Sequence, residues 1–236
     1  MFANRKLIMA AALTAGVFGA AAVSNAALIL NINNGAVVVT DNGAGDSDPT
    51  VGRIANTTTS AAGYSLAITL GTSNSPGSTT AGLLQINSLN VENGANPAVL
   101  DIRLSDTGFT NPAGTAMTLQ GSVGGTYTGG SLGNSVAFQS FADPANGQPA
   151  AAVSTPNLTF TKATPLLSEP FSGSNAVAWA RAAGPYSLAE HLVITLSANG
   201  QVQIAGATNA TAVPEPASIG LLGLGAVAAL ARRRRA

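Results

Sequence analysis

Cysteine is absent from this chain of 236 residues, and histidine occurs once, at His191. Disulfide scaffolds, catalytic thiols and thiolate metal sites are therefore excluded, and a single imidazole cannot build a histidine-rich zinc site. Charged residues make up only 8% of the chain, against roughly 25% in an average soluble domain. Aromatic residues are also scarce, at 5%, and include one tryptophan.

The formal net charge of zero hides an uneven distribution of charge along the chain. Two basic residues, Arg5 and Lys6, lie near the start, and four more, Arg232, Arg233, Arg234 and Arg235, lie near the end. Residues 27–212 keep four basic and nine acidic residues, a net charge of −5. Phosphate backbones need a basic surface, so we expect no nucleic acid partner. The length of this middle region fits one domain with its own core.

The first 26 residues have the three parts of a secretory signal peptide. Arg5 and Lys6 form the basic start, and an apolar stretch runs from Leu7 to Val23. Small residues, Ser24 and Ala26, then occupy positions −3 and −1 relative to a cut after Ala26. We predict an exported protein that loses residues 1–26. An uncleaved N-terminal anchor is the disfavoured alternative.

The last 24 residues have a different three-part pattern. Val213, Pro214, Glu215 and Pro216 precede an uncharged run over residues 217–231, and four arginines follow. Fifteen helical residues span ~22 Å, which is short of the ~30 Å hydrocarbon core of a bilayer. The arginines would stay on the cytoplasmic side. We therefore predict a marginal transmembrane helix over about 217–231, with Pro214–Pro216 facing outward.

Pro214 and Pro216 continue a helix poorly and favour extended backbone. Extended backbone is what a protease binds, so the pattern suits a temporary anchor that awaits cleavage. Residues 213–218, the Gly/Leu/Ala run and the arginine cluster together resemble the PEP-CTERM sorting domain. The resemblance implies processing by an exosortase, a membrane enzyme that cuts near Pro-Glu-Pro, in a Gram-negative bacterium that makes exopolysaccharide. A tail anchor that is never cut is the alternative.

Short apolar and β-branched segments separated by turn signals fill residues 27–207. No long stretch of this region has a helical period. In Leu83–Val91 the apolar positions change parity at Ser88, which predicts a strand with a bulge. We predict an all-β fold, an antiparallel β-sandwich or jelly-roll-like domain. Its candidate strands are 28–32, 36–40, 64–70, 83–91, 99–104, 116–121, 124–128, 135–141, 157–161, 176–180, 187–197 and 201–205.

Turn signals set the predicted connections. Asn199-Gly200 and Asn33-Asn34-Gly35 each predict a hairpin between their flanking strands. Gly124-Gly125 and Gly129-Gly130 are expected to bracket a short strand at 126–128, and residues 71–80 and 143–156 are expected to be long loops. Residues 208–212 are expected to link the domain to the sorting and anchor segment, 213–236. Phe109 and Tyr186 are natural core anchors in a fold with few aromatic residues.

One acidic cluster, Asp41, Asp46 and Asp48, lies in a Gly-rich segment. Carboxylate and carbonyl oxygens suit Ca²⁺, but the spacing differs from an EF-hand loop and no glutamate closes it. We favour a polar turn between strands and keep calcium as a weak candidate. No other metal and no cofactor is expected.

Catalytic candidates are few. His191 could act as a general base, and Asp101 with Asp106 could form a glycosidase pair. We favour His191 as a surface or half-buried strand residue, Asp101 as an exposed strand residue on the face of Arg103, and Asp106 as a turn residue. Trp179, two residues before Arg181, could stack on sugar, but a core position is favoured.

These features favour a non-catalytic structural protein of the cell surface or exopolysaccharide matrix. It would be exported, held transiently in the inner membrane by its C-terminal helix, cut by an exosortase and delivered to the surface. The alternatives are a lectin-like or adhesin-like carbohydrate-binding module, with or without calcium, and a secreted hydrolase that uses Asp101 or His191.

Overall fold

The computed structural model describes residues 28–94, 98–129 and 132–214. The predicted signal peptide with its cut after Ala26, the anchor helix over 217–231, Glu215, Pro216 and the Arg232–Arg235 cluster lie outside these ranges. Within them, no helix is long and apolar enough to cross a bilayer.

The described residues form thirteen strands and no helix. The all-β class is therefore confirmed. In chain order the strands are β1 (Ile29–Ile32), β2 (Val37–Thr40), β3 (Arg53–Ala61), β4 (Tyr64–Ser73), β5 (Ala81–Asn93), β6 (Ala98–Phe109), β7 (Ala116–Thr128), β8 (Ser135–Asp143), β9 (Val153–Ser154), β10 (Leu158–Thr161), β11 (Ser168–Ala180), β12 (Tyr186–Leu196) and β13 (Gln201–Ala212).

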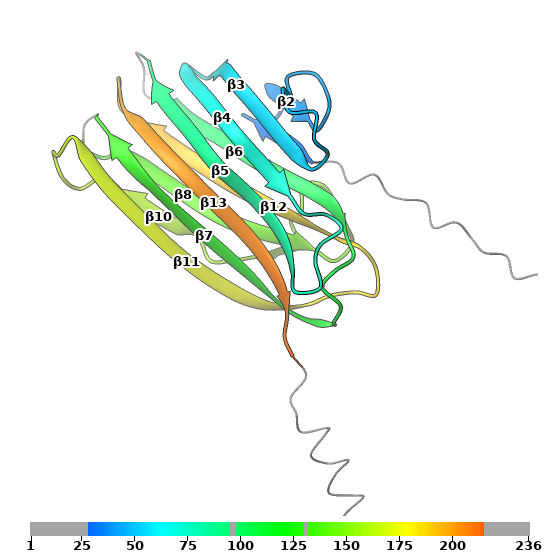
Figure 1. The fold of residues 1–236 in the computed structure, drawn as a ribbon. Helices are drawn as coiled ribbons and strands as arrows, with labels where there is room; N and C mark the ends of the chain where they lie inside the picture. The colour runs from blue at the N-terminus through cyan, green and yellow to red at the C-terminus, as the bar shows by residue number, and fades with distance from the viewer. Residues whose placement is uncertain (1–27, 95–97, 130–131, 215–236) are drawn as a thin grey trace, which may run out of the picture.

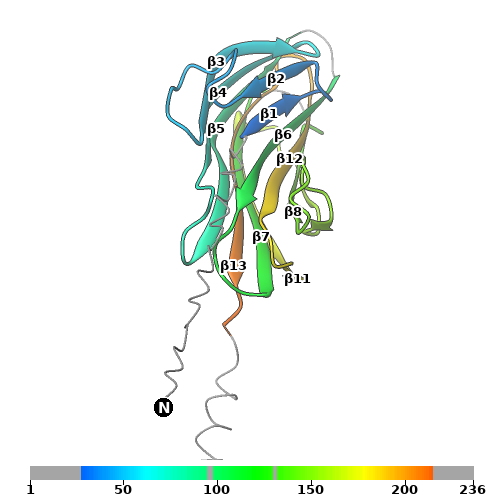
Figure 2. The ribbon, with the colours of Figure 1, turned by 90° about the vertical axis from the view of Figure 1, so that its right-hand side faces the viewer.

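Two antiparallel sheets pack face to face as a sandwich (Figures 1 and 2). Sheet A has seven strands in the order β10-β8-β12-β6-β1-β2, with β9 beside β8. Sheet B has six strands in the order β11-β7-β13-β5-β4-β3. From β5 onward the chain passes repeatedly between the sheets, so strands that are neighbours in space are far apart in sequence.

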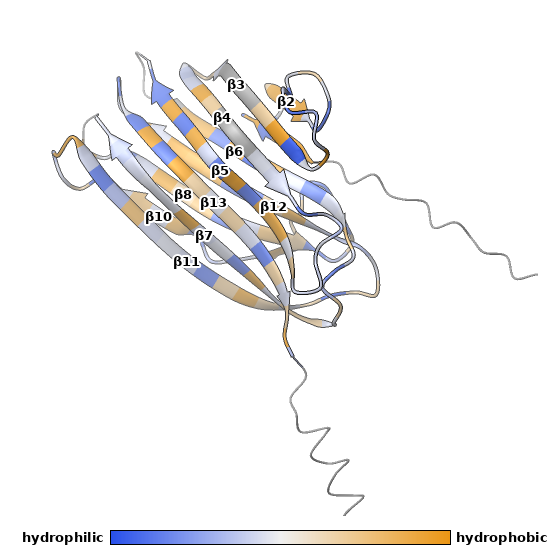
Figure 3. Cartoon of the chain, viewed as in Figure 1, coloured by the Kyte–Doolittle hydropathy of each residue, from blue (hydrophilic) through white to orange (hydrophobic). Residues whose placement is uncertain are grey.

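The core follows from period-two alternation. Along β12, Leu192, Ile194 and Leu196 are fully buried between the sheets, while His191 points to the outer face. Figure 3 shows the same alternation as orange and blue bands along β5 and β13. Phe109 and Tyr186 are buried and stacked with their ring centroids 5.4 Å apart, which confirms them as core anchors.

Two turn predictions have opposite outcomes. The Asn33–Gly35 hairpin is confirmed, because β1 and β2 pair and all three residues take positive φ. The Asn199–Gly200 hairpin is wrong, because β12 belongs to sheet A and β13 to sheet B. The connection is an arch from one sheet to the other. The side chain of Asn93 stabilises it by donating to the carbonyls of Leu196 and Ser197.

The predicted break at Gly124-Gly125 is absent, and β7 runs through it. A side chain at Gly125 would collide with the Phe171 ring of β11 and with the Gln203 carbonyl of β13. Glycine here makes room for a neighbour and does not mark a turn. The bulge at Ser88 is confirmed, because the register between β13 and β5 shifts between Ile204 and Gly206.

Strand β13 also continues through residues 208–212, where a linker is expected. Thr208 and Ala210 are fully buried, and the whole stretch pairs with β7. Small and polar residues there resemble a linker in composition, but they keep the strand alternation. The folded domain therefore ends at the sorting segment itself.

Candidate functional site

The chain leaves the sandwich at the end of β13, at the lower end in Figure 1. The Val213 N–H donates to the carbonyl of Ala116 at 2.9 Å, and the Val213 side chain is 44% exposed. Pro214 follows outside the strand and is exposed. Val213 and Pro214, the first two residues of the predicted sorting motif, thus follow directly after β13, and Val213 still hydrogen-bonds to the start of β7.

Three loops surround this point: residues 74–80, 110–115 and 181–185. We call them, together with Val213, the exit end. Arg181 joins two of them, since its guanidinium donates to the carbonyls of Pro112 at 2.6 Å, Thr110 at 2.7 Å and Gly184 at 3.1 Å. The guanidinium also lies over the Tyr186 ring, 4.9 Å from its centroid. Trp179 is buried and packs edge-on to the same ring, so the core assignment of Trp179 is confirmed.

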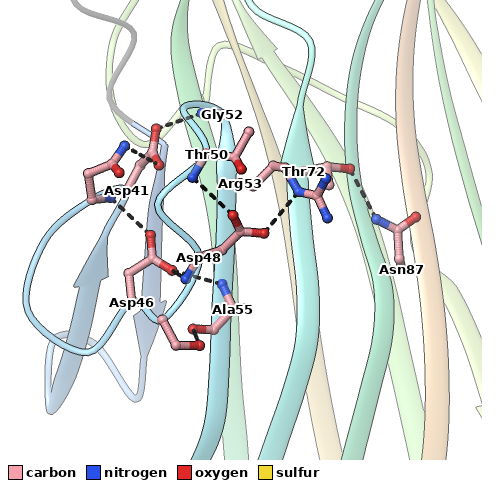
Figure 4. A network of polar contacts seen from close by, with 11 residues as sticks. Asp41, Asp46, Asp48, Thr50, Gly52, Arg53, Ala55, Thr72 and Asn87 are labelled. Atoms are coloured by element: carbon pink, nitrogen blue, oxygen red, sulfur yellow. Dashed lines mark hydrogen bonds and ion pairs between the residues drawn. The ribbon is translucent and has the colours of Figure 1, made fainter.

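The three aspartates of the acidic cluster bind the loop that carries them (Figure 4). Asp46 accepts three backbone N–H bonds, from Asn42, Asp48 and Ala55, at 2.9–3.0 Å. Asp41 accepts from the N–H of Gly52 at 2.7 Å, and Asp48 pairs with the Arg53 Nε at 3.0 Å. Hydrogen bonds to Thr50, together with Arg53, hold the pKa of Asp48 below its usual value.

Within the described ranges, no three acidic or histidine side chains converge on a point that a metal ion could occupy. N–H donors already occupy the carboxylate oxygens of Asp46 and Asp48. We therefore expect that millimolar Ca²⁺ leaves the melting temperature of the domain unchanged, as followed by circular dichroism with EDTA as the reference. A calcium-dependent rise of several degrees would contradict this expectation.

Asp101, Arg103 and His191 meet on the outer face of sheet A. The His191 Nε2 lies 2.7 Å from Asp101 Oδ2, and the Arg103 Nε lies 3.6 Å from Asp101 Oδ1. The His191 side chain is 17% exposed, which confirms a half-buried strand position on the face shared by Asp101 and Arg103. Among the described residues, no serine or threonine hydroxyl hydrogen-bonds to His191. In the described part of the chain the pair therefore has an orienting carboxylate but no hydroxyl nucleophile in hydrogen-bond contact with the imidazole.

Asp106 is not a turn residue. It lies within β6 and is 1% exposed, so it cannot pair with Asp101 across a cleft. It shares strand parity with Leu100, Ile102 and Leu104, which places all four on the inner face. Burial raises the pKa of Asp106 to about 6, although hydrogen bonds from Ser73 and Thr107 oppose the rise.

Glu190 on β12 is the second buried acid, and we assigned it no role from the sequence. It is fully buried between the sheets, and burial raises its pKa to about 8 against weaker opposing contacts from Thr208 and Ile86. Its register partner Ser140 shares a 2.6 Å hydrogen bond with the Thr208 hydroxyl of the other sheet. The sequence does contain a signal for the burial of Glu190, because Glu190 has the same strand parity as Leu188 and Leu192.

A shallow groove of about 500 Å³ crosses the outer face of sheet B. It continues toward β4 as a second hollow of about 240 Å³. Of the described residues that line these two hollows, only Glu92 is charged, and none is aromatic. Its polar lining comes from amide and hydroxyl side chains: Gln85, Asn87, Asn90, Gln201, Gln203, Ser65, Ser122, Ser172, Ser174 and Thr128.

Two solved structures are distantly similar to this chain. One is the enzymatically active domain of tailspike protein 4 of bacteriophage CBA120, with 11% identity, a TM-score of 0.28, and coverage of 61% of this chain. The chain spans 19% of that protein. Another is the N-terminal cellulose-binding domain of Cellulomonas fimi β-1,4-glucanase C, with 17% identity, a TM-score of 0.28, and coverage of 55% of this chain and 81% of that one. Neither is similar enough to bear on what this chain binds.

No curated protein matches the chain. A family model does match its C-terminal segment: residues 212–235 fit the PEP-CTERM protein-sorting motif. The match begins at the last residue of β13 and includes Pro-Glu-Pro and all four arginines, Arg232–Arg235. The chain therefore carries, directly behind its β-sandwich, a PEP-CTERM protein-sorting motif, the recognition signal for exosortase processing of an exported protein.

Proposed function

We propose that this chain is a non-catalytic structural protein of the cell surface or exopolysaccharide matrix, delivered there by cleavage near Pro214–Pro216. In this proposal residues 217–231 hold the exported domain at the inner membrane until the cut. The released sandwich then remains in the hydrated polymer outside a Gram-negative cell.

One observation carries the proposal: the fold and the sorting motif meet without a gap. The last backbone hydrogen bond described at this end of the chain comes from Val213, one residue beyond β13, and the motif match starts at residue 212. A cut near Pro-Glu-Pro therefore removes none of the strand pairing found in the part of the chain that the structure describes.

A non-catalytic role is supported by the separation of the catalytic candidates. His191 and Asp101 lie on the outer face of sheet A, whereas Asp106 lies inside the fold. If the domain were a hydrolase based on the former pair, His191→Ala and Asp101→Asn would each abolish its activity.

The groove on sheet B supports a second candidate function, binding of a neutral polysaccharide. Amide and hydroxyl groups on a surface whose one described charged residue is Glu92 match the hydroxyl groups of a sugar chain, and an open groove accommodates a polymer along its length. The absence of aromatic rings from its described lining predicts weak affinity per sugar unit.

Ala205→Ile tests this candidate because Ala205 lines the groove and is exposed, and isoleucine fills the groove without adding an aromatic ring. We expect the unmodified domain to be retarded in gels that contain the neutral exopolysaccharide of the producing strain, and the variant to bind about tenfold more weakly, a loss of about 1.4 kcal/mol. Ala180→Ile is the matched control, since Ala180 is exposed on β11 outside the groove. Equal retardation of both variants and the parent would refute a role for the groove.

A further inference from the structure

We infer that, before processing, the exit end of the sandwich rests on the phospholipid headgroups of the membrane, with the strands pointing away from the bilayer. This inference rests on the anchoring role proposed for residues 217–231. It adds an orientation and a contact surface that the sorting motif alone does not specify.

Chain length sets the first constraint. Val213 is still bonded to Ala116, so only residues 213–216 separate the fold from the uncharged run. Four extended residues reach at most ~14 Å. The headgroup layer occupies about 5–8 Å of each leaflet, so little room remains between the exit end and the lipid.

Direction is the second constraint. The Val213 hydrogen bond keeps the chain in line with β13 where it leaves the sheet. Pro214 and Pro216 then favour extended backbone, which limits folding back. A twelve-residue strand is about 40 Å long, so the opposite end of β13 lies well above the headgroups.

The exit end also has the right surface for this contact. Its three loops contain one charged residue, Arg181, whose guanidinium is engaged by three carbonyls. Anionic lipids repel acidic residues. Glu92 and Glu169 lie at the opposite end, where they pair in register with Gln201 and Tyr127. Asp143 ends β8 in register with Ser187, two residues beyond the loop 181–185, and its carboxylate accepts the N–H of Ala145.

The loops of the exit end are fixed to one another, so they present one surface. Both Thr110 and Asn111 donate backbone N–H bonds to the carbonyl of Pro76. The Tyr186 hydroxyl donates to the carbonyl of Asn111, and the Arg181 N–H donates to the carbonyl of Thr115. The contact with lipid therefore does not require a loop to fold first.

The lack of cysteine makes the test direct. Single variants Ala113→Cys and Ala182→Cys place a fluorophore on exposed positions of the exit end, and Ala198→Cys is the matched control at the opposite end. Chains from residue 27 to 236 are reconstituted by detergent removal into phosphatidylethanolamine–phosphatidylglycerol vesicles that contain a headgroup spin-labelled lipid. We expect several-fold stronger quenching at the two exit positions than at Ala198.

A flexible insert of 20 Gly/Ser residues after Ala212, with a mean span of roughly 25 Å, should reduce quenching at the exit positions to the level of Ala198. Flotation of the vesicles reports anchoring separately. Anchored protein with equal quenching at all three positions would overturn the orientation and leave the sorting proposal intact. Failure to float would overturn the anchor, and with it both proposals.

Discussion

Glu190→Gln is expected to raise the melting temperature of the domain by about 5–10 °C at pH 8 and to change it little at pH 4. The carboxyl group of Glu190 is fully buried, and burial raises its pKa to about 8 from an ordinary value of 4.5. At pH 8 the folded state must therefore either keep a proton on the Glu190 carboxyl group or bury its unpaired negative charge in the core. Glutamine has a similar shape but does not ionise, so the variant carries neither of these two free-energy costs.

The sign of the pH dependence follows from proton linkage. Between pH 4.5 and 8 the native state keeps a proton on Glu190 that the unfolded chain releases, so the free energy of unfolding falls as pH rises. Below 4.5 the stability is fully present, and above 8 no further loss occurs. Asp106 adds a smaller fall in the same direction between pH 3.8 and about 6. For Glu190 the loss is on the order of a few kcal/mol.

Melting curves of residues 27–213 from pH 4 to pH 9 would measure this effect. The unmodified domain should lose stability across the range, Glu190→Gln should flatten most of the slope, and Asp106→Asn should flatten only the acidic part. Glu92→Gln, an exposed glutamate of β5, is the control and should follow the parent. A parent whose stability stays constant or rises from pH 5 to pH 8 would show that Glu190 is ionised in the fold.

The buried acids also show what alternation alone can predict. Parity along β12 places Leu192, Ile194 and Leu196 inside, and the same rule places Glu190 there. An acid at an inner position is easily passed over, because acidic residues are rarely buried. For Asp106, the turn preference of aspartate outweighed the parity that it shares with Leu104, and the prediction was wrong.

Which strands are neighbours could not be predicted from local signals. Asn199-Gly200 has the composition of a hairpin turn, but β12 and β13 do not pair with each other. They belong to different sheets, whose inner faces form opposite sides of the core. The groove on sheet B could not be predicted from the sequence for the same reason. Its walls come from β5, β7, β11 and β13, and only the strand order brings Gln85, Ser122 and Ser174 together.

The sorting segment is the opposite case, because its function depends on local chemistry. Replacement of Pro214, Glu215 and Pro216 by three alanines is expected to block processing and leave the protein in the inner membrane with its tail attached. Alanine is the best helix former, whereas proline disfavours helix by about 3 kcal/mol. The three alanines would add to the uncharged run, and 18 helical residues span ~27 Å, close to the ~30 Å hydrocarbon core.

The substitution should therefore act twice, by removing the extended site and by lengthening a marginal anchor. It should leave the fold intact, since Val213, whose N–H donates to the carbonyl of Ala116, is the last residue with a described backbone hydrogen bond and is unchanged. Cell fractionation with intact-mass measurement would show the full-length tail in the membrane fraction. Pro165→Ala is the control, because Pro165 is exposed on a loop of the sandwich and its variant should be processed normally. Release of the triple-alanine variant at the parental rate would mean that Pro-Glu-Pro does not direct processing of this chain.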